Sequence, residues 1–326
     1  MLKKIMNHAS IELEITPLDP LLIKSGQATV SGVDMAFVQT YRNGKAQPFL
    51  PGSSLKGVIR SYAEKICRSL RDAPVPVCLP YLKPEEAKGG DAKQASCGLV
   101  FEKYKKDNNV NSIGTDNIYK LSCPACRLFG SHDYIGRLAT TDGYLMDSHV
   151  LEVRNVVAID RLTGGTVQGA LFDLEVLVKG NFKTSIDIRN YERWQLGLIG
   201  LVLRDMEEGL IRIGFGKSRG YGRIQAKISK FRVSYYKLGM AQLTGIYSMC
   251  SDAERIAYGL HPEATTAAAL PEPEKNNGLR IDYDITESWK EKLNPALTDL
   301  QEYIAQVQWP SALEAYVRSA DDERRQ

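Results

Sequence analysis

The sequence predicts an α+β protein built on a ferredoxin-like (RRM-like) βαββαβ core. Two segments, Ser10–Leu18 and Arg223–Val233, alternate apolar and polar residues as half-buried strands do. Between them lie two segments with helical periodicity, Pro51–Leu70 and Tyr191–Glu208, which are separated by strand-like segments. The resulting order of strand, helix, strand, strand, helix and strand is the basis of the prediction.

Residues 51–70, PGSSLKGVIRSYAEKICRSL, predict the first helix. Its apolar residues recur at the i, i+3, i+4 and i+7 spacing of one buried face. We expect Ser53 or Ser54 to be the N-cap, and Gly52 to let another backbone come close. The free N–H groups of the first turn favour an anion. The alternative is an ordinary capped amphipathic helix.

Turn signals and apolar runs predict the remaining elements of the core. Asn43-Gly44 is a turn signal that predicts a hairpin before the first helix. A strand is expected around Leu138–Met146. Two apolar segments, Val150–Ile159 and Ala170–Val178, enclose the sequence DRLTGGTVQG, which predicts a long hairpin at about 150–178 with a Gly-Gly tip.

Two parts of the chain differ from the rest of residues 1–236. Residues 72–130 begin with several prolines and many Lys, Asp and Asn residues, which predicts an insertion. Residues 237–326 predict an acidic, mainly helical C-terminal extension, with a linker at 262–277 and a helix within 285–307.

The net charge of +3 is unevenly distributed. Residues 241–326 contain 15 Asp and Glu and 8 Lys and Arg, a net charge of −7, which leaves +10 for residues 1–240. A basic body with an acidic tail suggests that the body binds a polyanion. A merely dipolar surface is the alternative.

The chain shows no targeting or membrane signal. The first residues, MLKKIMNHAS, contain no apolar run, and the most apolar window, Trp194–Leu203, is too short to span a bilayer. We therefore expect a cytoplasmic protein that binds no membrane. In that compartment its six cysteines are expected to be thiols or metal ligands rather than disulfides.

The cysteines suggest a metal site. Cys123-Pro-Ala-Cys126 is a CxxC sequence, which commonly forms half of a zinc site. Cys78 and Cys97 lie upstream in the insertion, so we expect a four-cysteine structural zinc site, with His132 as a substitute ligand. Because the spacing is not that of a standard zinc ribbon, buried free thiols are the alternative.

Residues 214–224, GFGKSRGYGRI, are rich in glycine and cations. Glycines let backbone N–H groups approach a phosphate, and Lys217 and Arg219 supply positive charge. The segment is not a Walker loop, because the GxxxxGK[ST] spacing is absent. A flexible turn into the last strand is the alternative.

Five motifs, in this order, resemble the RAMP superfamily, and within it the repeated backbone subunit of type III CRISPR effectors, the Csm and Cmr complexes. They are LLIKSG, PGSSLKGVIR, CPACRLFG, RNVVAIDRLTGG with ALFDLEV, and GFGKSRGYGRI, and they lie within residues 1–235. The acidic tail and residues 72–120 of the insertion lie outside the resemblance.

The resemblance implies a subunit that polymerises along a guide RNA (crRNA) with copies of itself, related RAMP subunits and other type III effector subunits. A protruding hairpin, the thumb, would run through Asn155–Gly169 and kink the guide at about six-nucleotide intervals. Complementary target RNA would be cut beside each kink. Cutting would require a divalent cation, Mg or Mn, and would leave a 2′,3′-cyclic phosphate.

The resemblance also implies which residues do this. Those implied at the guide RNA are Lys24, Ser25, Ser53, Ser54, Lys56, Arg60, Arg154, Arg161, Lys217 and Arg219. The cutting residue would be Asp34, in the sequence SGVDMAF.

The chemistry proposed for Asp34 is plausible because RNA carries its own nucleophile, the 2′-OH. A carboxylate could act as general base, or hold a metal ion that stabilises the leaving 5′-oxygen. The alternative for Asp34 is a turn or cap residue after Gly32. Asp133, Asp142 and Asp160 are other candidate carboxylates, although carboxylates are normally solvated surface groups.

Three other functions compete with a cutting subunit. The first is a structural RNA-binding subunit of the same complex that does not cut. The second is a repeat-processing endoribonuclease, whose relatives use a histidine near the N-terminus, for which His8 is the candidate. The third is a small-molecule enzyme on the same fold, since a fold does not fix a function.

Overall fold

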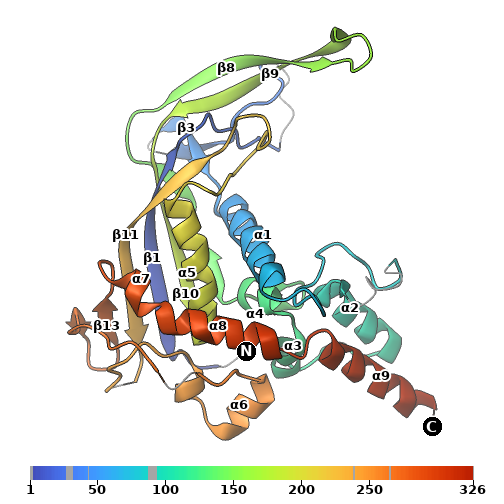
Figure 1. The fold of residues 1–326 in the computed structure, drawn as a ribbon, viewed down its shortest axis with the longest axis vertical. Coiled ribbons are helices and arrows are strands. Elements are labelled where there is room, and N and C mark those ends of the chain that lie inside the picture. The colour runs from blue at the N-terminus through green and yellow to red at the C-terminus, as the bar shows by residue number, and fades with distance from the viewer. Residues whose placement is uncertain are drawn as a thin grey trace.

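The computed structural model describes residues 3–26, 32–42, 44–86, 94–237, 239–263 and 266–325, with side chains to residue 319. Figure 1 shows a long twisted sheet with helices α1 and α5 side by side on one face, and a two-stranded hairpin that projects from one end. The described part of the chain contains no helix that combines the length and the apolar character needed to cross a membrane.

The elements have the following bounds. The strands are β1 (Asn7–Pro17), β2 (Gln39–Arg42), β3 (Lys45–Leu50), β4 (Gly130–Ser131), β5 (Tyr134–Ile135), β6 (Leu138–Thr140), β7 (Gly143–Leu145), β8 (Val150–Ile159), β9 (Thr166–Lys179), β10 (Phe182–Arg189), β11 (Ile224–Tyr235), β12 (Lys275–Asn276) and β13 (Ile281–Asp284). The helices are α1 (Gly52–Leu70), α2 (Cys97–Asn108), α3 (Thr115–Leu121), α4 (Pro124–Phe129), α5 (Arg193–Glu207), α6 (Asp252–Tyr258), α7 (Trp289–Lys292), α8 (Asn294–Gln306) and α9 (Ser311–Arg325).

Strand β1 lies in the interior of the large sheet, paired antiparallel with β10 on one side and β11 on the other. The full order is β12-β13-β11-β1-β10-β7-β3-β2, and β6 also pairs with β10. Ile11, Leu13 and Ile15 of β1 are fully buried while the residues between them are partly exposed, as the alternation predicted. The mixed α+β class predicted from the sequence is confirmed.

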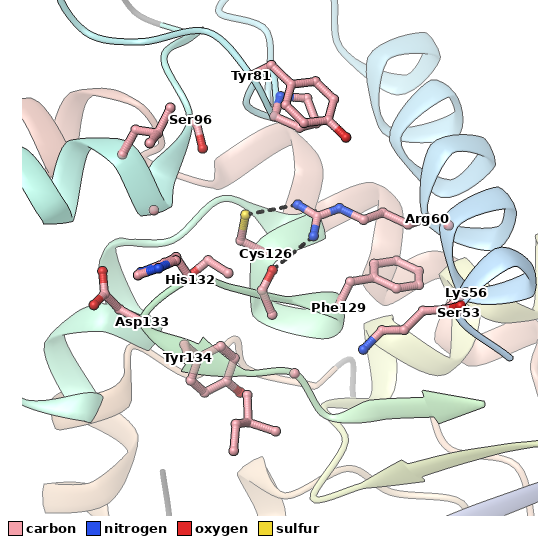
Figure 2. Close-up of a pocket in the computed structure, with 18 of the residues that line it drawn as sticks. Ser53, Lys56, Arg60, Tyr81, Ser96, Cys126, Phe129, His132, Asp133 and Tyr134 are labelled. Carbon is pink, nitrogen blue, oxygen red and sulfur yellow. Dashed lines mark hydrogen bonds between the residues drawn. The ribbon is translucent and has the colours of Figure 1, made fainter. Parts of the chain in front are cut away.

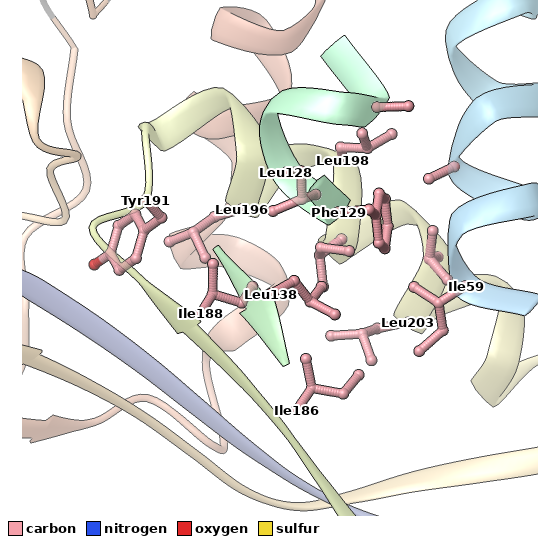
Figure 3. Close-up of a cluster of buried hydrophobic side chains, with 14 of the residues drawn as sticks. Ile59, Leu128, Phe129, Leu138, Ile186, Ile188, Tyr191, Leu196, Leu198 and Leu203 are labelled. Carbon is pink, nitrogen blue, oxygen red and sulfur yellow. The ribbon is translucent and has the colours of Figure 1, made fainter. Parts of the chain in front are cut away.

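The apolar core lies between the sheet and its covering helices. In Figure 3, Ile59 of α1 and Leu203 of α5 point toward Ile186 of β10, and Leu138 of β6 and Phe129 of α4 complete the cluster. The first and second helices were therefore predicted with the correct buried faces, since Leu55 and Ile59 are buried in α1. The predicted segment 191–208 corresponds to α5.

The prediction for the start of α1 was wrong. Ser53 and Ser54 are not N-caps; they are exposed residues within the first turn, and α1 begins at Gly52 after Pro51. The backbone N–H of Gly52 donates instead to Oδ1 of Asp142, at 2.8 Å. The predicted close approach at Gly52 is confirmed, because a Cβ there would lie 2.9 Å from the carbonyl oxygens of Thr140 and Thr141.

The segment predicted as one strand at 138–146 is two short strands, β6 and β7. Thr141 and Asp142 interrupt it, and β6 and β7 pair with successive parts of β10. The predicted hairpin before α1 is formed by β2 and β3, in which Arg42 lies opposite Lys45. Gly44 has a φ of +76°, as its turn requires, while Asn43 lies outside the described residues.

The predicted long hairpin is confirmed as the ribbon β8–β9. Its strands pair from Val150 opposite Lys179 to Ile159 opposite Thr166. The tip turn is closed by Asp160, whose Oδ1 accepts hydrogen bonds from the N–H groups of Leu162 and Thr163 at 2.7 and 3.2 Å. Most of its side chains are exposed, and in Figure 1 the ribbon extends beyond the rest of the molecule.

The insertion and the C-terminal segment are more regular than predicted. Helices α2 and α3 lie in the insertion, and β13 pairs with β11, so the C-terminal segment adds to the large sheet. Helix α8 falls within the predicted range and packs on α5, where Gly197 allows close contact because a Cβ would lie 2.1 Å from the carbonyl oxygen of Ala296. The domain division at residue 236 stays a prediction.

We predict that the ion pair between Arg193 of α5 and Asp299 of α8 fixes this packing. The pair is fully buried and bidentate, with N···O distances of 2.5 and 3.0 Å. Asp299→Asn should lower the free energy of unfolding by about 3 kcal/mol, because it leaves a buried guanidinium without its counter-charge. Urea denaturation measures the change. The exposed Glu291→Gln is the control, and an equal loss in both variants would contradict the prediction.

Candidate nucleic-acid interface and cysteine cluster

The segment after β1 turns back on itself at the base of the hairpin β8–β9. Its outgoing arm pairs with β9 through Leu21 and Leu177, with N···O distances of 2.9 and 2.7 Å. Its returning arm pairs with the outgoing arm, where the N–H of Val38 donates to the carbonyl of Ile23 at 2.8 Å. This arrangement brings Lys24, on one arm, to the base of the hairpin.

Two predicted RNA-binding cations share one aromatic ring. Nζ of Lys24 lies 5.1 Å from the ring centroid of Phe215, and Cζ of Arg219 lies 5.7 Å from it. The ring is held in place because the N–H of Phe215 donates to the carbonyl of Leu22 at 2.7 Å. Two cations held at one ring favour an anion between them. The sequence pattern did not identify Phe215, because only the glycines and cations around it indicate phosphate binding.

Two of the four glycines in the loop 214–224, Gly214 and Gly222, are required by close packing against backbone. A Cβ at Gly214 would lie 2.3 Å from the carbonyl oxygen of Leu22, and one at Gly222 would lie 2.0 Å from that of Ile213. Both glycines also have positive φ values, of +77° and +78°. The loop is thereby held against the segment that follows β1.

Other cations lie around this loop. Hydrogen bonding to Glu152 raises the pKa of Arg154, and the nearby Tyr221 of the glycine loop adds to the shift. Partial burial lowers the pKa of Lys217, and the charge of Lys65 on α1 lowers it further. Lys65, which the sequence analysis did not single out, therefore adds to the same positive region.

We call Lys24, Arg154, Lys217 and Arg219, with Phe215, the basic surface. Within the described part of the chain, Lys24, Lys217 and Arg219 form no salt bridge, and Arg154 pairs with Glu152 at 3.2 Å. Arg161 lies elsewhere, in the exposed turn at the hairpin tip.

The start of α1 lines a cleft of about 920 Å³ together with α4 and residues of the insertion. Figure 2 shows Lys56 and Arg60 reaching from α1 into this cleft, with Phe129, Tyr134 and His132 on its walls. Burial lowers the pKa of Lys56, and the neighbouring charge of Arg60 adds to the shift. An anion bound in the cleft would relieve both effects.

The guanidinium of Arg60 contacts the protein as well as solvent. Its guanidinium donates to Oε1 of Glu64 at 3.0 Å, to the carbonyl of Gly130 at 3.0 Å and to Sγ of Cys126 at 3.4 Å. Desolvation would lower its pKa, but the charges of Cys126 and Glu64 raise it. Several of the donors that the resemblance assigned to a phosphate are thus engaged by the chain itself.

The four predicted cysteines form one buried cluster. The Sγ atoms of Cys78, Cys97, Cys123 and Cys126 all lie within 4.8 Å of one another. Cys78 Sγ is 3.6 Å from Cys126 Sγ and 3.7 Å from Cys123 Sγ. Cys78 and Cys97 come from the part of the insertion before α3, and Cys123 and Cys126 from the start of α4, so the cluster joins these parts of the chain and could hold a metal ion.

The environment of Cys123 favours a thiolate. Burial opposes ionisation, but hydrogen bonds from Cys126, Cys78 and Cys97 lower the pKa of Cys123 well below its usual value. The backbone N–H of Cys126 also donates to Cys123 Sγ at 3.4 Å, since Cys123 is the N-cap of α4. Metal ligation by cysteine requires the thiolate form. His132, the substitute ligand, is not a member of the cluster.

Asp34 lies on the returning arm, with an exposed side chain, next to the hairpin base. Its Oδ2 accepts a hydrogen bond from the N–H of Asp173 at 2.9 Å. Among the described residues its Oδ1 has no hydrogen-bond partner. The carboxylate is therefore positioned by the protein and open to solvent on one side.

The other candidate side chains have partners of their own. Asp142 accepts from the start of α1, Asp160 closes the hairpin tip, and Asp133 forms an ion pair with Lys105. Nε2 of His8 lies 2.8 Å from Oδ1 of Asp187, across the pairing of β1 with β10. Each has a structural contact that accounts for its residue type.

These features describe an α+β protein with a protruding hairpin and a cationic surface at its base. The sequence model of the RAMP superfamily matches residues 14–225, more than half of the chain, so the chain belongs to the RAMP superfamily. It is also 28% identical, over 199 residues, to the CRISPR system Cms endoribonuclease Csm3 of Methanocaldococcus jannaschii. That alignment covers 56% of this chain and 64%, or just under two thirds, of the relative.

We predict that the purified chain carries about one metal ion per four-cysteine cluster. Cys97→Ser should lose most of that metal and melt at a lower temperature, because the part of the insertion that carries Cys78 and Cys97 is no longer tied to α4. Metal analysis and thermal unfolding measure the two effects. Cys250→Ser is the control, since Cys250 is buried outside the cluster. Equal metal content in the wild type and in Cys97→Ser would contradict the prediction.

Proposed function

We propose that this chain is a guide-RNA-binding subunit of a type III CRISPR effector complex, and that it also cuts target RNA paired with the guide. Its family and its similarity to a CRISPR endoribonuclease support the proposal. The observation that carries it is the convergence of the basic surface, the Asp34 carboxylate and the base of the protruding hairpin. Its partners would be crRNA, target RNA, further copies of itself and other type III subunits in the cytoplasm.

In this proposal the basic surface and the α1 start bind the sugar–phosphate backbone of the guide. Lys24 and Arg219 would contact phosphates beside Phe215, whose ring offers a face for a nucleobase. Phosphates at the cleft would be contacted by Ser53, Ser54 and Lys56. The free backbone N–H groups in the first turn of α1 would add hydrogen bonds to them. Such contacts would read the backbone without reading its sequence.

The remaining RNA contacts belong to the hairpin and the segment after β1. Ser25 would contact the guide beside Lys24. The hairpin β8–β9 would act as the thumb, with Arg154 at its base and Arg161 at its tip near RNA. Repeated along a filament, it would kink the guide at about six-nucleotide intervals. The strands β11, β1 and β10, with β6 and β7 together in the place of a fourth strand, would be the ferredoxin-like core that supports these contacts.

Cleavage would use the 2′-OH of the nucleotide beside each kink as nucleophile. Asp34 would accept its proton, or would hold the divalent cation, Mg or Mn, that stabilises the leaving 5′-oxygen. The 2′-oxygen attacks the adjacent phosphorus and the bond to the 5′-oxygen breaks. The products would be a 2′,3′-cyclic phosphate and a 5′-hydroxyl.

The cysteine cluster would hold a structural zinc ion. Thiolates bound tetrahedrally at about 2.3 Å from Zn²⁺ keep neighbouring sulfurs about 3.8 Å apart, and the distances of 3.6 and 3.7 Å in the cluster fit that arrangement. Arg60, which donates to Cys126, would offset part of the negative charge of the four thiolates. We therefore assign Arg60 primarily to the zinc site and only secondarily to RNA binding.

A subunit that binds the guide without cutting is the second candidate. The hydrogen bond from Asp173 to Asp34 favours it, because a purely structural turn residue would make the same contact. A repeat-processing endoribonuclease is less well supported, since its candidate histidine, His8, is paired with Asp187.

We predict that the basic surface sets the affinity for RNA. Lys217→Gln and Arg219→Gln should each weaken binding of single-stranded RNA by a similar factor for all sequences. Each should also lower the slope of log K against log salt by about 0.7, because each removes one phosphate contact. Fluorescence anisotropy over a series of salt concentrations measures both quantities. The exposed Lys275→Gln, in β12, should change neither, and a wild-type slope in both test variants would refute the assignment.

We predict that Asp34→Ala abolishes cleavage in the assembled complex. The rate should fall at least about 100-fold, because the variant loses its general base or metal ligand. Guide occupancy and assembly should stay at the wild-type level, since the Asp34 carboxylate accepts its hydrogen bond from the backbone of Asp173, which is not a proposed guide-binding residue. Gel analysis of end-labelled target RNA measures rate and spacing. A wild-type cutting rate in Asp34→Ala would remove Asp34 from the mechanism, and an inactive wild-type complex would favour the second candidate.

A further inference from the structure

We propose that Glu175 on β9 is a positioning residue for Asp34, and that it holds the cutting carboxylate at a fixed offset from the thumb. The inference rests on the proposed function. Its evidence is a set of contacts between the returning arm, residues 32–38, and the strand β9, which continues outward as one side of the thumb.

The returning arm pairs with β9 through backbone hydrogen bonds. The N–H of Met35 donates to the carbonyl of Asp173 at 3.0 Å, and the N–H of Glu175 donates to the carbonyl of Met35 at 3.0 Å. Met35 and Leu174 thus form a parallel bridge. The arm is in effect a short extra strand alongside the thumb ribbon.

Two side chains clamp the arm on either side of this bridge. On one side, Asp34 Oδ2 accepts from the N–H of Asp173 at 2.9 Å. On the other side, Glu175 Oε2 accepts from the N–H of Phe37 at 2.9 Å. Phe37 and Leu174 are both buried in the core, so the arm and the strand are each anchored there.

The contact also extends to the second strand of the thumb. Nδ2 of Asn155, on β8, donates to Oδ1 of Asp173 at 2.6 Å, and Asn155 lies opposite Asp173 in the ribbon. The Asp34 carboxylate, β9 and β8 are therefore connected by consecutive hydrogen bonds. Asp34 cannot shift along the thumb without breaking several of them at once.

This connection gives the thumb a second role besides kinking the guide. The nucleotide that is kinked and the phosphodiester that is cut must keep a constant separation if cleavage is to occur at regular intervals. Here the register between the arm and β9 fixes that separation. Misplacement of a catalytic group by about 1 Å can lower a rate by about 100-fold, so a loosened arm should affect both rate and position.

Glu175 is the part of this clamp that can be changed without altering Asp34 itself. Glu175→Ala removes the acceptor for the Phe37 N–H, and Glu175→Asp keeps the charge but shortens the side chain. Glu175→Gln retains an oxygen acceptor at the same reach. The three variants separate the hydrogen bond from the charge.

The test uses the complex assembled with guide RNA and an end-labelled complementary target. We expect Glu175→Ala and Glu175→Asp to cut about tenfold more slowly and at phosphodiesters adjacent to the normal sites as well. Glu175→Gln should restore wild-type positions and a rate within about twofold of the wild type. Guide occupancy should not change. Glu287→Ala, which removes an exposed carboxylate in the C-terminal segment, is the matched control.

Asp34→Ala separates the two ways in which the idea could fail. If Asp34→Ala still cuts, the proposed role of Asp34 is wrong and the positioning role of Glu175 is lost with it. If Asp34 is required but Glu175→Ala and Glu175→Asp cut at the wild-type rate and positions, only the positioning role is overturned. Failure of Glu175→Gln to restore regular cutting would also overturn it, because the retained hydrogen bond would then be without effect.

Discussion

The start of α1 is fixed by a contact that only glycine permits. Gly52 lies against the backbone of Thr140 and Thr141, its N–H donates to Asp142, and its carbonyl accepts from the hydroxyl of Thr140. This contact joins α1 to the break between β6 and β7, and β6 and β7 in turn pair with β10. The direction of α1 is thus set by the sheet, and with it the positions of Lys56 at the cleft and Arg60 at the cysteine cluster.

The same helix connects two sites that looked separate in the sequence. Lys56 and Arg60 are one helical turn apart, so they lie on the same face of α1. The side chains of Lys56 and Arg60 both line the cleft, and the guanidinium of Arg60 also donates hydrogen bonds to Cys126 and Gly130. Loss of the cysteine cluster would therefore release the guanidinium beside the cleft. The integrity of the cysteine cluster and the shape of the cleft are in this way coupled through one side chain.

Sequence patterns predicted those parts of the fold in which local periodicity and tertiary burial agree. The alternation in β1, the apolar face of α1 and the pairing of β8 with β9 are examples. The start of α1 could not be predicted, because Asp142, which accepts a hydrogen bond from the N–H of Gly52, is distant in sequence. Strands β12 and β13 have only two and four residues, so even the alternating Ile-Asp-Tyr-Asp sequence of β13 is too short to indicate a strand. In the site, the cysteine set and the glycine loop were found from residue type alone, while the roles of Phe215 and Glu175 depend on backbone pairings that no local pattern records.

The acidic C-terminal segment matters for the site because of where its charges lie. Glu274 pairs with Lys230 and Arg232 of β11, which lowers the pKa of Glu274 to about 2, and Glu254 pairs with Lys4. In the described residues, the ion pairs that this segment makes with the body use cations other than those of the basic surface. A carboxylate that is already paired with another cation, and whose field salt screens beyond about 10 Å, does little to neutralise the basic surface. The chain can thus have a net charge of only +3 while, within its described residues, Lys24, Lys217 and Arg219 form no salt bridge.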